Sequence, residues 1–340
     1  MTDSADRRFV WLLALSVVLQ VGFGGLRFND GSSLVAFARD GFGAELRPGF
    51  EYLLDSQLKV LVLYWIGADQ AWFIGLFFLC LNILPYLTVF FLKSEFKNAV
   101  LLFIALTPFT KVLAQNVGIG DSVQLAIIIG LVFSRSFLVS FAISFLIILW
   151  HFQQGVILLL LIVVLFQVLS FSRLLQFGHI LGLICGVVSH YVIKGLSGRV
   201  YAGRLEYVAE VWLQDIYHSM FFLPLMILVV LPGIYIVWLV GVHQFEKRVI
   251  SSIIAIGVVA LVLSMIVIDR SRVLFILTFP IFMCILRKEK VSREIVVGFA
   301  DLRIFLPIVF FSAVIPLSAN QNIDIYVWSA LVEDVRRWLH

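Results

Sequence analysis

Charged side chains are scarce in this sequence. Lys, Arg, Asp and Glu together make up 14% of the 340 residues, whereas hydrophobic types make up 62%, and the mean hydropathy is +1.07. Soluble globular domains are about 45–50% apolar, so this composition excludes that class. The net charge of +4 comes from basic residues in short groups between apolar runs. Because these residues form no basic stripe, we expect no nucleic-acid partner.

Cysteine is rare, and the common catalytic motifs are absent. Cys80, Cys185 and Cys284 lie inside apolar runs without CxxC spacing, which predicts neither a disulfide framework nor a metal cluster. No P-loop, HExxH, GxSxG or channel-filter sequence occurs, so the signatures of nucleotide binding, zinc proteolysis and serine hydrolysis are missing. Runs broken by Gly or Pro do not recur in matching halves, as they would in an inverted-repeat transporter.

Long apolar runs fill most of the chain. They are continuous, and backbone groups in hydrocarbon must be satisfied within the segment, so we predict helices and not a barrel. Since a spanning helix takes about 20 residues, charges and Gly, Pro or Asn clusters divide the chain into runs at 9–26, 69–92, 98–116, 121–134, 136–150, 154–172, 175–193, 217–241, 249–268, 272–286 and 302–317. The predicted fold class is all-α, a polytopic helical membrane protein with about 11 transmembrane helices in one domain spanning 1–340. The short fourth and fifth runs also fit a broken hairpin.

The basic residues predict the orientation. With eleven spans, the basic residues at 7–8, 93–97, 135, 173, 247–248 and 287–293 all fall on one side. The positive-inside rule makes that side cytoplasmic, with the N-terminus inside. The first run has no small-residue cleavage site, which indicates a retained start-transfer helix. Compact loops favour a bacterial inner membrane, and the other polar clusters are then external.

The longest external segment is residues 27–68. It contains a short amphipathic stretch that ends at Arg39 and a longer one over 50–66. In the longer stretch, three charged residues at four-residue spacing share one face of a helix: Glu51, Asp55 and Lys59. We therefore predict two juxtamembrane helices lying in the membrane interface, with these three charges facing water.

Three carboxylates are the first candidates for chemistry. Asp30 in "FND" and Asp40 in "RDGFG" follow the first run at the outer surface, where a carboxylate can project into a cavity or simply stabilise a turn. Asp121 in "NVGIGDSVQL" stands in a turn before an apolar run. It is equally typical of a helix N-cap and of a binding site.

Other polar residues near the outer surface could bind a ligand. Lys111 lies near the outer end of the third run, where an ionisable residue is a functional candidate and snorkelling is the alternative. His151 is followed by Gln153 and Gln154 and could bind hydroxyl groups. Arg204 belongs to a charged external segment for which a solvated loop is the plain interpretation.

Arg270 and Arg272 stand in "DRSR" between two apolar runs, on the side where basic residues are normally scarce. Two guanidinium groups at that boundary match the geometry of a phosphate or pyrophosphate. An internal pair between Asp269 and an arginine is the alternative.

This layout resembles the GT-C superfamily of membrane glycosyltransferases, which use sugars linked to polyprenyl phosphate. The similar features are an inside N-terminus, a long first outer loop with juxtamembrane helices and an early acid (Asp30 or Asp40), and a second acidic turn, "GIGDS". Downstream, "SRSFLVSFAISFLIILWHFQQG" is similar to the hydrophobic pair ending in a polar outer turn that many such proteins carry. The resemblance covers about the first half of the chain.

The resemblance implies transfer of a sugar from a polyprenyl-phosphate donor to a glycan or lipid-linked acceptor on the outer face. Asp30, or second Asp40, would act as general base toward the acceptor hydroxyl. The remaining candidates would bind substrate: Lys111, Arg270 and Arg272 the lipid phosphate, and Asp121 and His151 the sugar hydroxyls. Arg204 is a further substrate-binding candidate. A role for a divalent cation is left open.

Two other functions fit the same composition. An O-antigen or exopolysaccharide polymerase acting on undecaprenyl-pyrophosphate-linked units would depend most on Arg199, Arg204, Arg270 and Arg272, and less on the first-loop acids. A lipid-linked-sugar transporter would need charges deep within its spans, for which only Lys111 is a candidate. A non-enzymatic assembly subunit is a further alternative.

Overall fold

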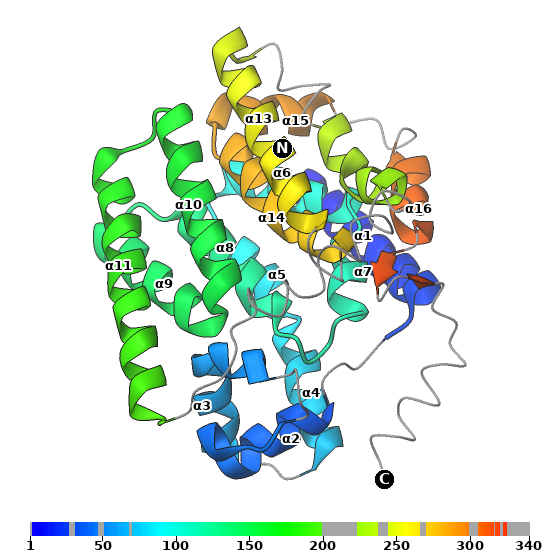
Figure 1. Ribbon diagram of the computed structural model, residues 1–340. Helices are drawn as coiled ribbons and strands as arrows, with labels where there is room; N and C mark the ends of the chain where they lie inside the picture. The colour runs from blue at the N-terminus through cyan, green and yellow to red at the C-terminus, as the bar shows by residue number, and fades with distance from the viewer. Residues whose placement is uncertain are drawn as a thin grey trace. The chain divides into compact units, whose positions relative to one another are not determined.

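The computed structural model describes residues 2–26, 31–46, 51–67, 70–198, 223–236, 244–265, 270–298, 305–315, 317–319 and 322–324. These residues are almost entirely helical, apart from the short antiparallel strands β1 (Leu317–Ala319) and β2 (Asn322–Asp324) (Figure 1). The predicted all-α class is confirmed. Within the described ranges, 3 helical segments are long and apolar enough to cross a membrane: Ala71–Phe90, which contains a short turn at Asn82 and Ile83, Arg173–Leu196 and Lys247–Met265.

By its internal contacts the chain forms two compact units, where the composition had suggested one domain. The first unit comprises Met1–Arg27, Pro85–Gln115 and Gln214–Leu331, and the second comprises Phe28–Leu84, Asn116–Leu213 and Val332–His340. The candidate residues are divided between them: Asp40, Asp121 and His151 belong to the second unit, and Lys111, Arg270 and Arg272 to the first.

The first unit is built around one buried helix. Its described helices are α1 (Thr2–Gly24), α5 (Leu84–Phe90, which starts one residue before the unit), α6 (Ser94–Leu106), α7 (Phe109–Ala114), the helix Leu223–Ile236, α13 (Lys247–Met265), α14 (Arg270–Leu286), α15 (Glu289–Gly298) and α16 (Phe305–Val314). Every residue of α14 is buried. Its Phe275 and Phe279 rings pack against Phe109, and Phe279 also contacts Phe103, so aromatic burial fixes α14 against α6 and α7.

The predicted run 98–116 is interrupted between α6 and α7, because Pro108 lacks a backbone N–H. Gln20 of α1 binds the backbone groups at this break: its Nε2 donates to the Thr107 carbonyl at 2.8 Å and its Oε1 accepts from the Lys111 N–H at 2.9 Å. Ser16, one turn earlier in α1, donates to the Ala105 carbonyl at 2.6 Å. Polar side chains of α1 therefore satisfy a helix break that hydrocarbon could not.

The second unit contains the first-loop helices and two helical hairpins. Its elements are α2 (Gly31–Asp40), η1 (Gly41–Gly43), η2 (Glu51–Asp55), α3 (Gln57–Ile66), α4 (Ala71–Leu81), α8 (Asp121–Phe133), α9 (Phe137–Trp150), α10 (Phe152–Val168) and α11 (Arg173–Leu196). The predicted run 69–92 therefore holds two helices, α4 and α5, which meet at Asn82 and Ile83.

Close packing of α9 on α11 depends on three glycines at four-residue spacing, Gly178, Gly182 and Gly186. A Cβ atom at Gly182 would lie 2.6 Å from both the Phe141 carbonyl and the Ser144 side chain of α9. Small residues at this spacing let helix backbones approach closely in membranes, where apolar burial between helices supplies little driving force. Figure 1 shows the two helices side by side.

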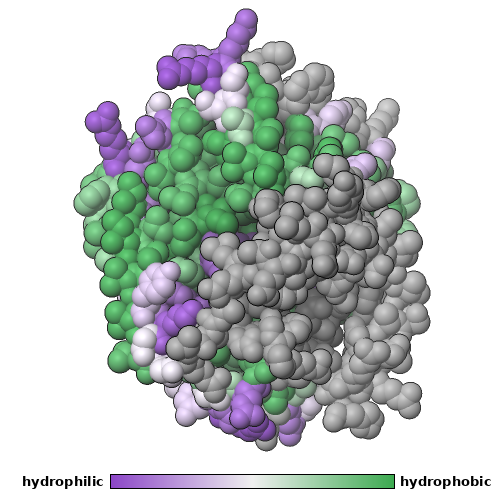
Figure 2. All heavy atoms as spheres, viewed as in Figure 1, coloured by the Kyte–Doolittle hydropathy of each residue, from purple (hydrophilic) through white to green (hydrophobic). Residues whose placement is uncertain are grey.

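The outer face of α11 is apolar. Its exposed large side chains recur every three or four residues and include Phe177, Ile180, Ile184, Val188 and Tyr191. Figure 2 shows a broad hydrophobic surface over this part of the second unit. A continuous apolar stripe of this kind is typical of a helix that faces lipid.

Candidate site under the first-loop helices

The first-loop helices share one hydrophobic core with the start of α8 and the end of α9. This first-loop core contains Leu34 and Phe37 of α2, Leu54, Val60 and Leu63 of η2 and α3, Ile74 and Phe78 of α4, and also Val117 and Trp150. Both predicted first-loop stretches are thus helical, but they are packed elements of the second unit. They cover the turn that precedes α8.

Trp150 and Gly120 fix that turn. The indole Nε1 of Trp150 donates to the Gly120 carbonyl at 2.9 Å. Gly120 has φ +90°, and a Cβ atom there would lie 2.9 Å from the indole ring. Only glycine combines this left-handed backbone with so close an aromatic contact, so the turn is locked against the last residue of α9.

Asp121 follows this turn as the first residue of α8 and is 2% exposed. The N-cap is Gly120, so the N-cap, one of the two interpretations of Asp121 that the sequence left open, is not observed. A carboxylate in the first turn is favoured by the helix dipole. Ser122 and Gln124 are buried beside it, and neither Ser122 Oγ nor Gln124 Nε2 has a hydrogen-bond partner among the described residues. The first turn of α8 thus offers a carboxylate, a hydroxyl and an amide, a set that suits a polyhydroxylated ligand.

His151 lies at the same end of the α8–α9 hairpin as Asp121. The two helices are antiparallel, so the last residue of α9 lies beside the turn before the first residue of α8. It is half-buried in the tight turn between α9 and α10, where its carbonyl accepts from the Gly155 N–H at 2.7 Å. Gln154 in the next turn has a buried Nε2 with no partner within the described ranges. The predicted polar group around His151 is therefore present, in the unit that holds Asp121.

The other predicted first-loop acids are less favourably placed. Asp40 ends α2, is exposed, and pairs with Nε of Arg39 at 2.9 Å. Such a surface pair is screened by solvent and leaves the carboxylate outside the first-loop core. Asp30 and Arg204 lie outside the described residues.

The prediction of a water-facing stripe on residues 50–66 is wrong. Asp55 is 7% exposed and Lys59 is 3% exposed. The helix is interrupted at Ser56, between η2 and α3, but Asp55 before the break and Lys59 after it both face protein instead of water. The side chain of Glu51 lies outside the described part of the chain.

Asp55 instead meets His190 of α11 in the interior of the second unit. Its Oδ1 lies 3.6 Å from His190 Nε2, and Gln57 Nε2 donates to the His190 carbonyl at 2.8 Å. The Phe152 ring stacks on the imidazole, with 3.6 Å between the centroids. A first-loop carboxylate is therefore tied to α11 by a histidine that sequence reasoning missed.

A signal for this contact was available in the sequence. His179 and His190 are eleven residues apart, about three helical turns, so they share one face of α11. His179 also has a buried partner, Ser144 of α9, at 2.9 Å from its Nδ1. Polar residues that recur on one face of an apolar helix mark the side that faces protein.

The Asp55–His190 contact predicts a measurable energetic coupling. Asp55→Leu or His190→Leu alone should each lower the unfolding free energy by about 1–3 kcal/mol, because each removes one side of a buried polar contact. The double variant should cost less than the sum of the two, with a coupling of about 1 kcal/mol or more. Unfolding in mixed detergent and SDS micelles measures all three, with the surface variant Asp40→Leu as control. Additive losses would contradict the coupling.

Lys111 in the first unit binds backbone. Its ammonium donates to the carbonyls of Ala313 at 3.0 Å and Ile315 at 2.6 Å, at the end of α16. A cation at a helix C-terminus satisfies carbonyls that lack helical partners. The stem packs on Gly24, where a Cβ atom would lie 2.9 Å from it. Lys111 therefore joins α1, α7 and α16, and we do not retain it as a phosphate ligand.

Arg270 and Arg272 lie in the first turn of α14, and Arg270 is 1% exposed. The expected turn at the membrane boundary is thus helical from Arg270 on, and both guanidinium groups are buried. Two guanidinium groups in the first turn of a helix are a candidate site for an anionic ligand, and Asp269, the alternative partner predicted for them, lies outside the described residues.

No family model, curated protein or solved structure matches this chain. The assignment of function therefore depends on the residues and their geometry. Among the described residues, no group of three or more His, Cys, Asp or Glu side chains could hold a metal ion.

Proposed function

We propose that this protein is an integral membrane glycosyltransferase that moves a sugar from a polyprenyl-phosphate donor to a glycan or lipid-linked acceptor. The observation that carries the proposal is the position of Asp121. This carboxylate is buried at the start of α8, next to a turn covered by the first-loop helices. Beside it are a hydroxyl and an amide that have no partner among the described residues. A buried acid with uncommitted polar neighbours is a typical hydroxyl-binding site.

The chemistry follows from these groups. A carboxylate, Asp121 or the first-loop Asp30, accepts the proton of the acceptor hydroxyl as its oxygen bonds to the anomeric carbon of the sugar. The bond from that carbon to the phosphate oxygen breaks, and its electron pair leaves with the lipid phosphate. The charge that develops on the phosphate needs a cation, and Arg270 and Arg272 of the first unit are the candidates for this role. His151 orients sugar hydroxyls.

The proposal includes a topology. About 11 membrane spans with a cytoplasmic N-terminus put the first-loop helices, Asp121 and His151 on the outer face of a bacterial inner membrane. The apolar outer stripe of α11 and the close α9–α11 packing support a membrane location.

Sugar transfer is preferred to its rivals on the same residues. A polymerase would rely chiefly on external arginines, of which Arg199 and Arg204 lie outside the described residues. Transfer is supported by the buried Asp121, which has a hydroxyl and an amide beside it without a partner among the described residues. A transporter would use Lys111, whose ammonium binds two backbone carbonyls.

An assay of the purified protein in proteoliposomes tests the proposal. The donors are polyprenyl phosphates that carry single radiolabelled sugars, and the acceptors are membrane glycolipids and glycans. We expect one donor to release free polyprenyl phosphate only when an acceptor is present. Elongation of pyrophosphate-linked oligosaccharides instead would favour the polymerase, and consumption of neither substrate would refute transfer.

A further inference from the structure

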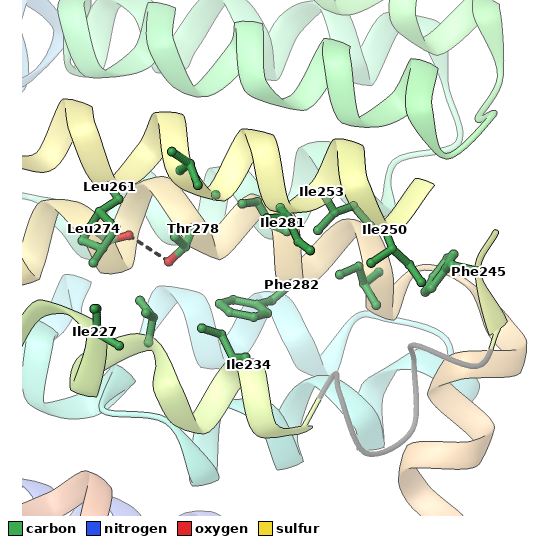
Figure 3. A pocket seen from close by; sticks show the side chains of 15 residues that line it. Ile227, Ile234, Phe245, Ile250, Ile253, Leu261, Leu274, Thr278, Ile281 and Phe282 are labelled. Atoms are coloured by element: carbon green, nitrogen blue, oxygen red, sulfur yellow. Dashed lines mark hydrogen bonds between the residues drawn. The ribbon is translucent and has the colours of Figure 1, made fainter. Parts of the chain in front are cut away.

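An apolar groove runs along α14 in the first unit. It has a volume of about 520 Å³ and lies between α14, α13 and the helix Leu223–Ile236. Figure 3 shows Leu274 and Leu261 at one end and Phe245 near the other, with Ile281 and Phe282 between them. The single hydroxyl in the wall, that of Thr278, donates to the Leu274 carbonyl at 2.8 Å. The wall is therefore hydrocarbon along its length.

One end of the groove, at Leu274, lies one helical turn from Arg270. The residues of α14 that line it are Leu274, Thr278, Ile281, Phe282 and Ile285, which form one helical stripe. Arg270 is four residues before Leu274, so it continues the same stripe by one turn. From Leu274 to Ile285 the wall extends about 16 Å along the helix axis.

The groove is also open at the surface of α13. Ile254 and Val258 line it and are exposed. In a protein whose helices face lipid, such an opening gives a hydrocarbon chain lateral access from the membrane. The groove thus combines an apolar wall, a lateral opening and a buried guanidinium in line with one end.

We propose that this groove holds the hydrocarbon chain of the polyprenyl phosphate carrier, with the phosphate at Arg270 and Arg272. The inference rests on the proposed function, and it adds the location of the lipid chain. The charge pattern selects the occupant: a single chain with an anionic end matches an apolar stripe that begins at a buried arginine. The chain segment nearest the phosphate lies between Leu274 and Ile285.

Gly257 provides a specific test. It lines the groove, and a Cβ atom there would meet nothing within 4 Å. The ring of Gly257→Phe would therefore project from α13 into the groove without a clash at the backbone. Replacing a glycine in the middle of a helix does not destabilise the helix. Gly22 of α1, also in the first unit, is equally open and lies outside the groove, so Gly22→Phe is the matched control.

Binding of undecaprenyl phosphate alone is measured by native mass spectrometry, with phosphatidic acid as competitor. We expect Gly257→Phe to lower the affinity for undecaprenyl phosphate about tenfold. Gly22→Phe should leave this affinity unchanged. Arg270→Gln should weaken it similarly. Arg248 is an exposed cation at the start of α13, near Phe245. Arg248→Gln should not change the affinity.

Three results would overturn the groove assignment. The first is that Gly257→Phe binds undecaprenyl phosphate as tightly as the wild type. The second is that phosphatidic acid binds equally well, which would make the occupant an ordinary membrane lipid. The third is that Arg248→Gln, and not Arg270→Gln, binds undecaprenyl phosphate more weakly. The assay requires no sugar transfer. Groove-dependent binding without any transferase activity would refute only the proposed reaction, whereas transfer that Gly257→Phe leaves intact would refute only the groove.

Discussion

Gly182→Ile should prevent the protein from accumulating in a folded form. The new Cβ atom would lie 2.6 Å from the Phe141 carbonyl and from Ser144, and the Phe141 contact is to backbone, which cannot rotate away. The two helices would have to separate, and the hydrogen bond between Ser144 and His179 would break in the same region. Overpacking alone costs about 1–3 kcal/mol, and the unsatisfied buried polar pair adds about as much.

The matched control lies on the same helix. Gly195, near the end of α11, is exposed and has nothing within 4 Å of a built Cβ atom. Gly195→Ile should therefore behave like the wild type in yield of monodisperse protein from membranes and in thermal midpoint in detergent. If Gly182→Ile matched Gly195→Ile in both measurements, the close packing of α9 on α11 would be refuted.

Sequence reasoning located most helices because apolar runs between charges leave few alternatives. The runs 121–134 and 136–150 correspond to α8 and α9 within a few residues. It missed the helix breaks, at Thr107 and Pro108 and at Asn82 and Ile83. Those breaks depend on whether a distant side chain satisfies the exposed backbone, as Gln20 does, and no local pattern contains that information.

The burial of charged residues was the harder part. Periodicity correctly put Asp55 and Lys59 in helical elements, but it could not reveal the break at Ser56 or the histidine on α11 that meets Asp55. Lys111 was recognised as unusual, and its partners are carbonyls more than 200 residues away in the sequence. In both cases long-range contacts decide the environment, and a one-dimensional pattern only identifies the residue as exceptional.

The same contrast applies to the three acids. All three stood in turn-like sequences after apolar runs. The structure separates two of them: Asp40 pairs with Arg39 at the surface, while Asp121 is buried beneath the first-loop core. Trp150 makes the difference, because its bond to Gly120 holds the turn before α8 within that core.

Asp121→Asn should therefore abolish sugar transfer while the protein stays folded. The amide keeps the size of the carboxylate but neither accepts a proton nor carries charge, and the loss of such a group lowers rates by about 10²- to 10⁴-fold. Loss of the favourable charge at the start of α8 should cost only about 0.3–1 kcal/mol. Acceptor-dependent release of polyprenyl phosphate in proteoliposomes measures the first effect, and the thermal midpoint in detergent measures the second.

Asp40→Asn is the control for this variant, because it removes a carboxylate of the same second unit that is exposed and paired with Arg39. Its transfer rate should stay within about twofold of the wild type, since exposed pairs contribute little. Asp30→Asn separates the roles of the acids: if it too abolishes transfer, Asp30 is the base and Asp121 orients the acceptor. Full activity in Asp30→Asn, Asp40→Asn and Asp121→Asn alike would exclude carboxylate-assisted transfer at this site.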